Sequence, residues 1–200
     1  MLREMRWVDV SQVIDIHESS WSEDEISVKL GRDYLKLFYQ NVVQLRYSFG
    51  YVYVKSGRVI GYATGFYDYH NFNRSFRRNI LSRLLLIVIR RLLTRKIELT
   101  DLINLLKDEK KLRNAKYPKH HLGALALANE HKKTDTGKTA ITETMVAVLN
   151  ELKSKGYPGC WGLCDARNMP MRKYLLGLGF EETDEIEFIG RSVVLYEKTF

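Results

Sequence analysis

The chain has 200 residues, of which 45% are hydrophobic and 28% are charged, and this is the composition of an ordinary globular protein of one domain. Its two cysteines, Cys160 and Cys164, are too few for a disulfide framework or a metal site of four cysteines. The apolar run Leu84–Ile89 is far shorter than the roughly 18 residues of a membrane span, and residues 1–10 lack the layout of a secretory signal. We therefore expect a single cytoplasmic domain over residues 1–200 that uses no metal.

The net charge of +8 originates in one segment of the chain. Residues 70–116 contain 13 Lys and Arg against 4 Asp and Glu, whereas the rest of the chain contains 19 basic and 20 acidic residues. A fold that binds nucleic acid as a whole would carry its positive charge more widely. The distribution indicates a local basic feature, and we do not expect a nucleic-acid partner.

The N-terminal part of the chain is predicted to contain one strand and two helices. Residues 2–8 alternate in polarity as a strand does. Asp9 and Gln12 are typical of a capping box at the start of a helix over Val10–Trp21. Apolar residues at helical spacing then predict a second helix from Ser22 to about Val42.

Beyond this part the period of the apolar residues changes several times. A hairpin of two antiparallel strands is predicted over Tyr51–Tyr67, and helical spacing returns from about Asn71 to Ala115. The remaining elements are a strand at His121–Ala128, a helix at Thr139–Lys155, a strand at Gly159–Cys164, a helix at Asn168–Leu178 and two strands near Glu185–Ile189 and Ser192–Lys198. This order predicts an α/β or α+β domain with a mixed sheet and no internal repeat.

Three segments carry a more specific pattern. Tyr51–Tyr67 is a hairpin containing Val-Ile-Gly-Tyr-Ala, Leu125–Lys138 leads from a strand through a Lys- and Thr-rich loop into a helix, and Asn168–Phe180 runs from Asn to Gly-Phe. Together they resemble the GNAT superfamily of N-acetyltransferases, with residues 70–116 as a basic helical insertion between the third and fourth strands. The resemblance implies a GNAT-like acyl-CoA N-acyltransferase fold and acetyl-CoA, or another acyl-CoA, as cosubstrate.

The loop within the second segment has the chemistry of an anion site. A helix N-terminus offers free backbone N–H groups, and glycine lets the backbone approach a diphosphate closely. The resemblance places Lys132 at the basic position, Gly137 at one glycine position, and Asp135 where the family has another glycine, so that Asp135 departs from the pattern. The cofactor-binding residues that the resemblance implies are Leu125, Ala126, Leu127, Lys132, Lys133, Thr136, Gly137, Lys138, Thr139 and Asn168.

Two other interpretations of this loop are possible. It can be a solvated turn that binds nothing. Gly137-Lys-Thr139 also matches the end of the phosphate loop of nucleotide hydrolases, but that motif needs glycine at the position of Lys132. We exclude the nucleotide-hydrolase motif and keep the solvated turn open.

The third segment predicts a cofactor contact and a proton donor. Asn168 caps a helix, and the resemblance implies that it also contacts the pantetheine arm of CoA. The family usually has a Tyr seven residues later that protonates the leaving thiolate, but Leu175 occupies that position and Tyr174 lies one residue earlier. One residue turns a helical side chain by about 100°. Tyr174 is our candidate general acid, and whether it faces the core or the cleft stays open.

The amine that attacks a thioester must also lose a proton. His120 and His121 open the strand of the acyl-CoA site, and because their side chains alternate, only one can face the cleft. Asp68 and Glu130 are weaker candidates for the base, and water can serve as well. Both histidines can instead be partly exposed residues at a strand entry. Cys160 and Cys164 are predicted to be core residues, because no activating partner is evident.

The basic segment Phe76–Lys96 is apolar on one side and cationic on the other. It can be a helix packed on the domain with a solvated basic face. It can also wall the acceptor cleft and attract an anionic or phosphorylated amine, attach to an anionic membrane, or form a homodimer through Leu84–Leu93.

Our hypothesis from the sequence is an acyl-CoA:amine N-acetyltransferase that acts by direct attack in a ternary complex on a small-molecule amine. The alternative is a non-catalytic GNAT-like CoA sensor or interaction module, which Asp135 and the displaced Tyr174 favour.

Overall fold

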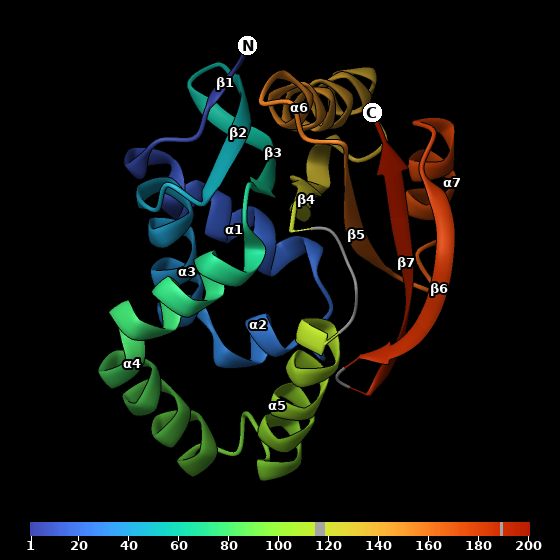
Figure 1. The fold of residues 1–200 in the computed structure, drawn as a ribbon. Helices are drawn as coiled ribbons and strands as arrows, with labels where there is room; N and C mark the ends of the chain where they lie inside the picture. Colours follow the sequence, from blue (N-terminus) through green and yellow to red (C-terminus); the bar gives the residue numbers. More distant parts are fainter. Residues whose placement is uncertain (115–118, 189) are drawn as a thin grey trace.

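The protein was analysed as a computed structural model that describes residues 1–114, 119–188 and 190–200, with the backbone alone given for residues 108–114. A seven-stranded sheet in the order β1-β2-β3-β4-β5-β7-β6 forms its centre, with helices on both faces (Figure 1). The strands are β1 (Leu2–Glu4), β2 (Ser48–Lys55), β3 (Arg58–Phe66), β4 (His121–Leu127), β5 (Gly159–Asp165), β6 (Glu181–Phe188) and β7 (Arg191–Thr199). The α-helices are α1 (Val10–Ser20), α2 (Ile26–Leu30), α3 (Arg32–Gln44), α4 (Tyr69–Leu93), α5 (Leu99–Asn114), α6 (Asp135–Ser154) and α7 (Met169–Gly177). The expectation of a mixed α/β sheet is confirmed.

Two hydrophobic cores lie on opposite faces of the sheet. On one face α1, α3 and the first half of α4 pack against β2 and β3, and Val13, Leu35 and Phe72 are among the fully buried side chains. On the other face α6 packs against β2, β3 and β4, and α7 joins the same core with β5 and β7; Val148 and Leu175 are buried there. The predicted hairpin of β2 and β3 is confirmed, and β2 is longer than the sequence indicated, since it begins at Ser48.

The N-terminus differs from the predicted strand and capping box. β1 ends at Glu4, and Trp7–Asp9 forms a 3-10 turn before α1. The Asp9 carboxylate does not cap α1; it accepts hydrogen bonds from the Arg3 guanidinium at 2.6 and 2.7 Å and from the Arg6 backbone N–H at 2.8 Å. The capping-box prediction was wrong because a neighbouring strand supplies Asp9 with a stronger, charged donor.

The helix predicted from Ser22 to Val42 is two helices separated by Gly31. Gly31 has φ +81°, a left-handed conformation that ends α2. A Cβ added there would lie 1.6 Å from a guanidinium nitrogen of Arg91, whose Nε donates to the Leu30 carbonyl at 3.0 Å. A side chain far away in the sequence therefore packs directly against the break between α2 and α3.

The basic segment forms a helical hairpin of α4 and α5 between β3 and β4. The prediction of helix over residues 71–115 is confirmed as far as Asn114, with a break after Leu93 where Arg95 has φ +52°; residue 115 lies outside the described residues. The distal half of α4 and α5 pack on α2 through a cluster around Ile97, and Lys29 Nζ lies 3.0 Å from Asp101 Oδ1. Among the described residues, no helix combines the length and apolarity required to traverse a bilayer.

The helices after β4 and β5 both begin with a side-chain cap. α6 starts at Asp135, one turn before the predicted start at Thr139, because the Thr134 hydroxyl accepts the Gly137 N–H at 3.0 Å. α7 starts after Asn168, whose side chain accepts the Met171 N–H at 3.2 Å, which confirms the predicted cap.

Candidate active site

The centre of the candidate site is the place where β4 and β5 separate. β4 pairs with β3 along its length, from His121↔Phe66 to Leu127↔Gly61. It pairs with β5 at one position, His121↔Trp161, where the Trp161 N–H donates to the His120 carbonyl at 3.1 Å. In the described structure the edge of β4 from Leu122 onward therefore has no β5 partner. Such an edge can hydrogen-bond an extended ligand as it would another strand.

A β-bulge lies on β4 within this open edge. Ala63 pairs with Leu125, and Gly65 pairs with Leu122. Three residue steps along β4 therefore lie opposite two residue steps along β3, and the irregularity falls at Gly123 and Ala124. A Cβ on Gly123 would lie 2.2 Å from the Thr64 hydroxyl, which donates to the Ala124 carbonyl at 3.4 Å. Neither this bulge nor Thr64 was predicted from the sequence, although glycine inside a strand is a signal for a bulge.

The first turn of α6 lies at the end of β4. Gly137 packs so closely on the preceding turn that a Cβ would lie 1.9 Å from the His131 carbonyl oxygen. Lys132 and Lys133 are exposed beside this turn. The carboxylate of Asp135 is 96% exposed and pairs with Lys138 Nζ at 3.0 Å. The aspartate therefore extends into solvent with its charge balanced, which leaves the backbone at the helix start accessible to an anion.

Thr136 and Thr139, both predicted to bind the cofactor, form hydrogen bonds in the first turn of α6. The Thr136 hydroxyl accepts a hydrogen bond from Lys55 Nζ at 3.2 Å, and the Thr139 hydroxyl donates to the Asp135 carbonyl at 3.0 Å. Lys55 adds a fourth lysine to this turn, and it was not among the residues predicted from the sequence.

Tyr174 lies between α7 and α6, the two helices that flank the separation of β4 and β5. Leu175, at the position where the resemblance predicted Tyr, is buried in the core. The Tyr174 hydroxyl is buried, has no hydrogen-bond partner in the described structure, and lies close to the Thr142 side chain of α6. Burial raises its pKa, and the proximity of Thr142 lowers it by less. The phenol therefore keeps its proton at neutral pH and can donate it.

The fold agrees with that of solved N-acetyltransferases. No protein-family model and no curated protein sequence matches the chain. An N-acetyltransferase from Staphylococcus aureus Mu50 superposes with a TM-score of 0.61 at 13% identity, over 100% of this chain and 97% of the other. A GNAT-family protein from Desulfovibrio desulfuricans gives 0.59 at 11% identity (100% and 98%), and the Thermoplasma acidophilum paia N-acetyltransferase in complex with coenzyme A gives 0.59 at 14% identity (100% and 98%).

The chain has the GNAT fold. Identities of 11–14% support this statement about architecture alone.

Within the GNAT fold, His121 lies at the closed end of the β4–β5 separation. Its ring centroid is 4.2 Å from that of Trp161 and 4.5 Å from that of Tyr69, and its Nδ1 is buried without a hydrogen-bond partner in the described chain. Burial, with a smaller contribution from His70, lowers the pKa of His121 to about 3. His121 is therefore neutral and only weakly basic at physiological pH.

His120 has a different environment from His121, as the alternation of strand side chains predicted. It stacks on Tyr157 at 3.7 Å, and its Nδ1 lies 2.7 Å from the Tyr67 carbonyl. It lines an open depression of about 490 Å³. The other residues of that depression are Arg46, Tyr47, Tyr67, Asp68, Lys155 and Tyr157.

The two weaker candidates for the base, Asp68 and Glu130, lie at a helix cap and in an exposed turn. Asp68 caps α4 by accepting the Asn71 N–H at 2.9 Å, and Glu130 is exposed in the 3-10 turn Asn129–His131.

Cys160 and Cys164 are buried, as predicted, and burial raises the pKa of the Cys160 thiol to about 12 and that of the Cys164 thiol to about 11. Both cysteines are therefore protonated and unreactive at neutral pH.

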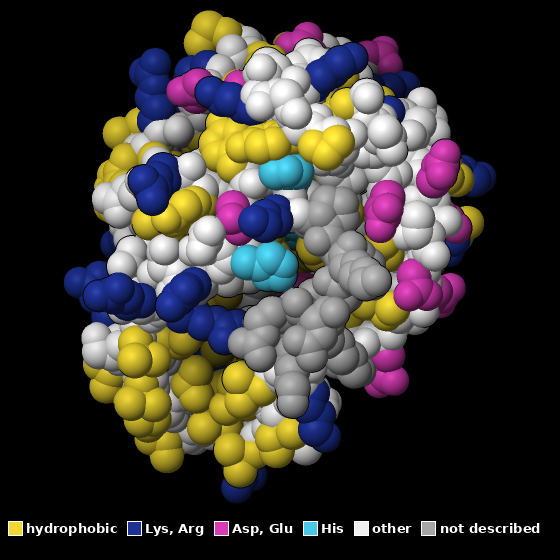
Figure 2. Space-filling view, in the orientation of Figure 1, with side chains coloured by type: hydrophobic (Ala, Val, Ile, Leu, Met, Phe, Trp, Pro, Cys, Tyr) yellow, Lys and Arg dark blue, Asp and Glu magenta, His cyan; other side chains and the backbone are white. Residues whose placement is uncertain are grey.

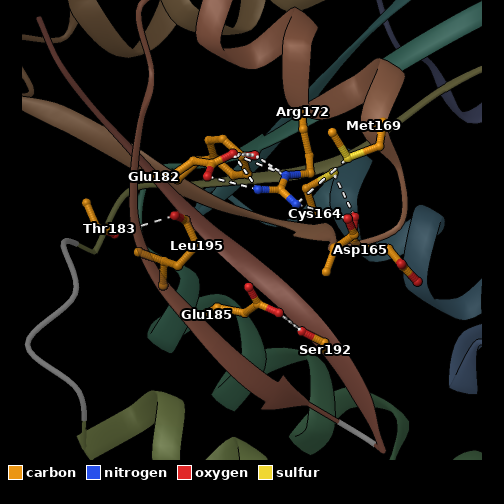
Figure 3. A network of polar contacts seen from close by, with 11 residues as sticks. Cys164, Asp165, Met169, Arg172, Glu182, Thr183, Glu185, Ser192 and Leu195 are labelled. Carbon is orange, nitrogen blue, oxygen red and sulfur yellow. Dashed lines mark hydrogen bonds and ion pairs between the residues drawn. The ribbon is translucent and has the colours of Figure 1, made fainter.

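An arginine on α7 fixes that helix to the sheet. Arg172 donates to both carboxylate oxygens of Glu182 at 3.0 and 2.9 Å, to the Tyr196 hydroxyl at 3.1 Å and to the Ala166 carbonyl at 3.1 Å. Figure 3 shows its guanidinium between Glu182 and Met169. Tyr174 lies on the same helix, which this network anchors to β6, β7 and the end of β5.

A second ion network links the start of β7, the end of β5 and the residue before α2. Arg191, at the start of β7, pairs with Glu25 next to α2 and lies 3.5 Å from Asp165 at the end of β5. Burial raises the pKa of Glu25, and the charge of Arg191 opposes that shift. The sequence analysis did not predict this network, since its three residues are far apart in the chain.

Proposed function

We propose that the chain is an N-acyltransferase that moves an acetyl or other acyl group from acyl-CoA to a primary amine. One observation carries the proposal: the edge of β4 beyond His121 lacks a partner in the described structure, between the capped starts of α6 and α7. The coenzyme A bound to the Thermoplasma protein of the same fold supports it.

The open edge of β4 matches the chemistry of CoA. The pantetheine arm is extended and contains amides, which can hydrogen-bond to the backbone of Leu125, Ala126 and Leu127. The diphosphate would bind at the first turn of α6, with Lys132 and Lys133 beside it. Thr136, Gly137, Lys138 and Thr139 shape this turn, and Asn168 would contact the arm from the start of α7.

In the proposed reaction the neutral amine attacks the thioester carbonyl carbon, forming the C–N bond and breaking the C–S bond. Backbone N–H groups at the bulge of Gly123 and Ala124 would stabilise the negative charge on the carbonyl oxygen. Tyr174 would give its proton to the departing thiolate. His121 and His120 are not paired with each other, and His121 is a weak base. We therefore propose that water accepts the proton that the amine loses. His121 would form part of the cleft wall.

A non-catalytic CoA-binding protein is the second candidate. It is favoured by Leu175, which is buried where the related family has a tyrosine. In that case Tyr174 would close the gap between α6 and α7 without donating a proton.

Calorimetric titration with acetyl-CoA, followed by a thiol-release assay, separates the two candidates. The assay would use polyamines, lysine peptides, and amino sugars with and without phosphate. We expect micromolar binding and thiol release that depends on one class of amine. Binding without release on any amine would identify the sensor, and an absence of binding at high micromolar acetyl-CoA would refute both.

A further inference from the structure

The helical hairpin of α4 and α5 carries a large exposed apolar surface. Its members are 44–80% exposed, although all of them are leucine or isoleucine. This apolar patch consists of Leu81, Leu85, Leu86, Ile89 and Leu93 on α4 and Leu99, Ile103 and Leu106 on α5. Figure 2 shows hydrophobic side chains gathered over these two helices, with dark blue Lys and Arg side chains bordering them. Apolar patches of this extent on a surface typically mark a binding site.

The patch is the second apolar face of α4. The first face packs into the core through Phe72, Phe76 and Ile80, and more distally onto α2. A helix that is apolar on both sides is expected to be covered on both sides. The fold itself does not need the exposed residues, because they lie opposite the packed face.

Positive charge continues directly from the patch. Arg74, Arg78, Leu81, Leu85 and Ile89 follow one another at intervals of four, three, four and four residues, which places them along one stripe of α4. Arg74 and Arg78 are exposed. α4 contains six arginines and no acidic residue. On α4 the apolar patch is therefore combined with cations alone, whereas α5 carries charges of both signs.

We propose that the apolar patch binds the surface of an anionic lipid bilayer. Leucine and isoleucine side chains would enter the interface between headgroups and acyl chains, while the exposed Arg74 and Arg78 of the same stripe would contact the anionic headgroups. A second copy of the chain is a poorer fit, because a two-fold contact would place the arginine-rich α4 near its own symmetry mate. In Figure 1 the hairpin lies at the opposite end of the molecule from α6, so that binding in this manner leaves the start of α6 accessible.

Co-sedimentation of the full chain with vesicles tests the proposal. We expect binding to phosphatidylcholine vesicles that contain phosphatidylglycerol, weaker binding to phosphatidylcholine alone, and loss of binding at high salt, because salt screens the arginines. The double variant Leu85→Ser with Ile89→Ser should weaken binding by about tenfold or more, because two side chains no longer enter the interface. Arg74→Gln with Arg78→Gln should weaken binding at low salt and remove most of its salt dependence.

Leu176→Ser is the matched control, because Leu176 is an exposed leucine on α7, away from the patch. It should bind vesicles as the unchanged protein does, and thermal unfolding of every variant would verify that it is folded. No binding to anionic vesicles, or equal binding by the patch variants and the control, would overturn the proposal. Light scattering that finds a dimer in the unchanged protein and a monomer in Leu85→Ser/Ile89→Ser would also overturn it and assign the patch to a second copy.

Discussion

The hydroxyl of Tyr174 is a buried polar group without a hydrogen-bond partner in the described part of the chain. An unsatisfied buried hydroxyl costs about 1–3 kcal/mol, so that a protein is expected to keep one for a functional reason. Its location between α6 and α7 gives such a reason, since the leaving thiolate of the proposed reaction would need a proton there.

Replacement Tyr174→Phe tests this role. We expect kcat for acyl transfer to fall by about 10²-fold, because the general acid is lost, with little change in the affinity for acetyl-CoA. The free energy of unfolding should stay the same or rise, since the unsatisfied hydroxyl is removed. Steady-state kinetics and urea unfolding measure the two quantities. Tyr53→Phe on β2 is the control, and equal kcat values for both variants would disprove the role of Tyr174.

Thr64 is the residue that supports the bulge of β4, because its hydroxyl donates to the Ala124 carbonyl. Thr64→Val keeps the shape of the side chain and removes this bond. We expect a loss of about 1 kcal/mol in the free energy of unfolding and a several-fold decrease in kcat, since the bulge would no longer hold its N–H groups in place.

Thr183→Val provides the comparison for Thr64→Val. The Thr183 hydroxyl also donates to a backbone carbonyl, that of Leu195 at 3.5 Å, but it lies on the edge strand β6. Urea unfolding and kinetics should find that Thr183→Val leaves kcat unchanged. A matching decrease in kcat for both variants would mean that the bulge has no specific role.

Among the secondary-structure elements, the start of α6 depends on one close contact. The Cβ that Gly137→Ala adds would collide with the His131 carbonyl and contact Leu127 at 2.8 Å. We expect a loss of about 1–3 kcal/mol in the free energy of unfolding, as for other overpacked sites, and at least tenfold weaker binding of acetyl-CoA. Calorimetry and urea unfolding measure both effects.

Gly177→Ala is the control for the α6 variant. Gly177 is the last residue of α7, and an added Cβ would meet no atom within 4 Å. Alanine in a helix is favoured over glycine, so that the free energy of unfolding should rise by about 0.5–1 kcal/mol. Unchanged acetyl-CoA binding in Gly137→Ala would show that the start of α6 does not hold the cosubstrate.

At the scale of the whole molecule, two histidines couple stability to pH, the buried His17 and the half-buried His121. Burial lowers the pKa of His17 to about 4 and that of His121, where His70 contributes too, to about 3, both from the ordinary value of 6.5. Between each lowered pKa and pH 6.5, the unfolded chain binds more protons than the folded chain. The free energy of unfolding is therefore highest above pH 6.5 and decreases as the pH falls. The slope should reach about 1.4 kcal/mol per pH unit for each histidine.

Urea unfolding between about pH 7 and pH 5 measures this slope, because most carboxylates stay ionised in that range. His121→Gln should flatten the curve, and His17→Gln should do the same. His131→Gln, in the turn before α6, is the control and should leave the slope unchanged. Glu25, whose pKa burial raises, contributes with the opposite sign but is common to all three variants. Equal slopes in all variants would contradict the assignment.

Much of this architecture could be predicted from local pattern. The hairpin of β2 and β3, the helical insertion, the cap at Asn168 and the core positions of Cys160 and Cys164 each depend on neighbours within a few residues. The turn and helix after β4 were predicted as well, but the helix starts at Asp135 because Thr134 caps it.

Contacts between distant segments decided the rest. The sequence by itself determined the order of the elements, because apolar periodicity and capping are local properties. Only the tertiary structure determined that β4 and β5 pair at a single position, that Gly123 opens a bulge against Thr64, and that Arg91 packs against the break between α2 and α3. Each of these depends on strand register or on a side chain far along the chain, and such relations are fixed by packing in three dimensions.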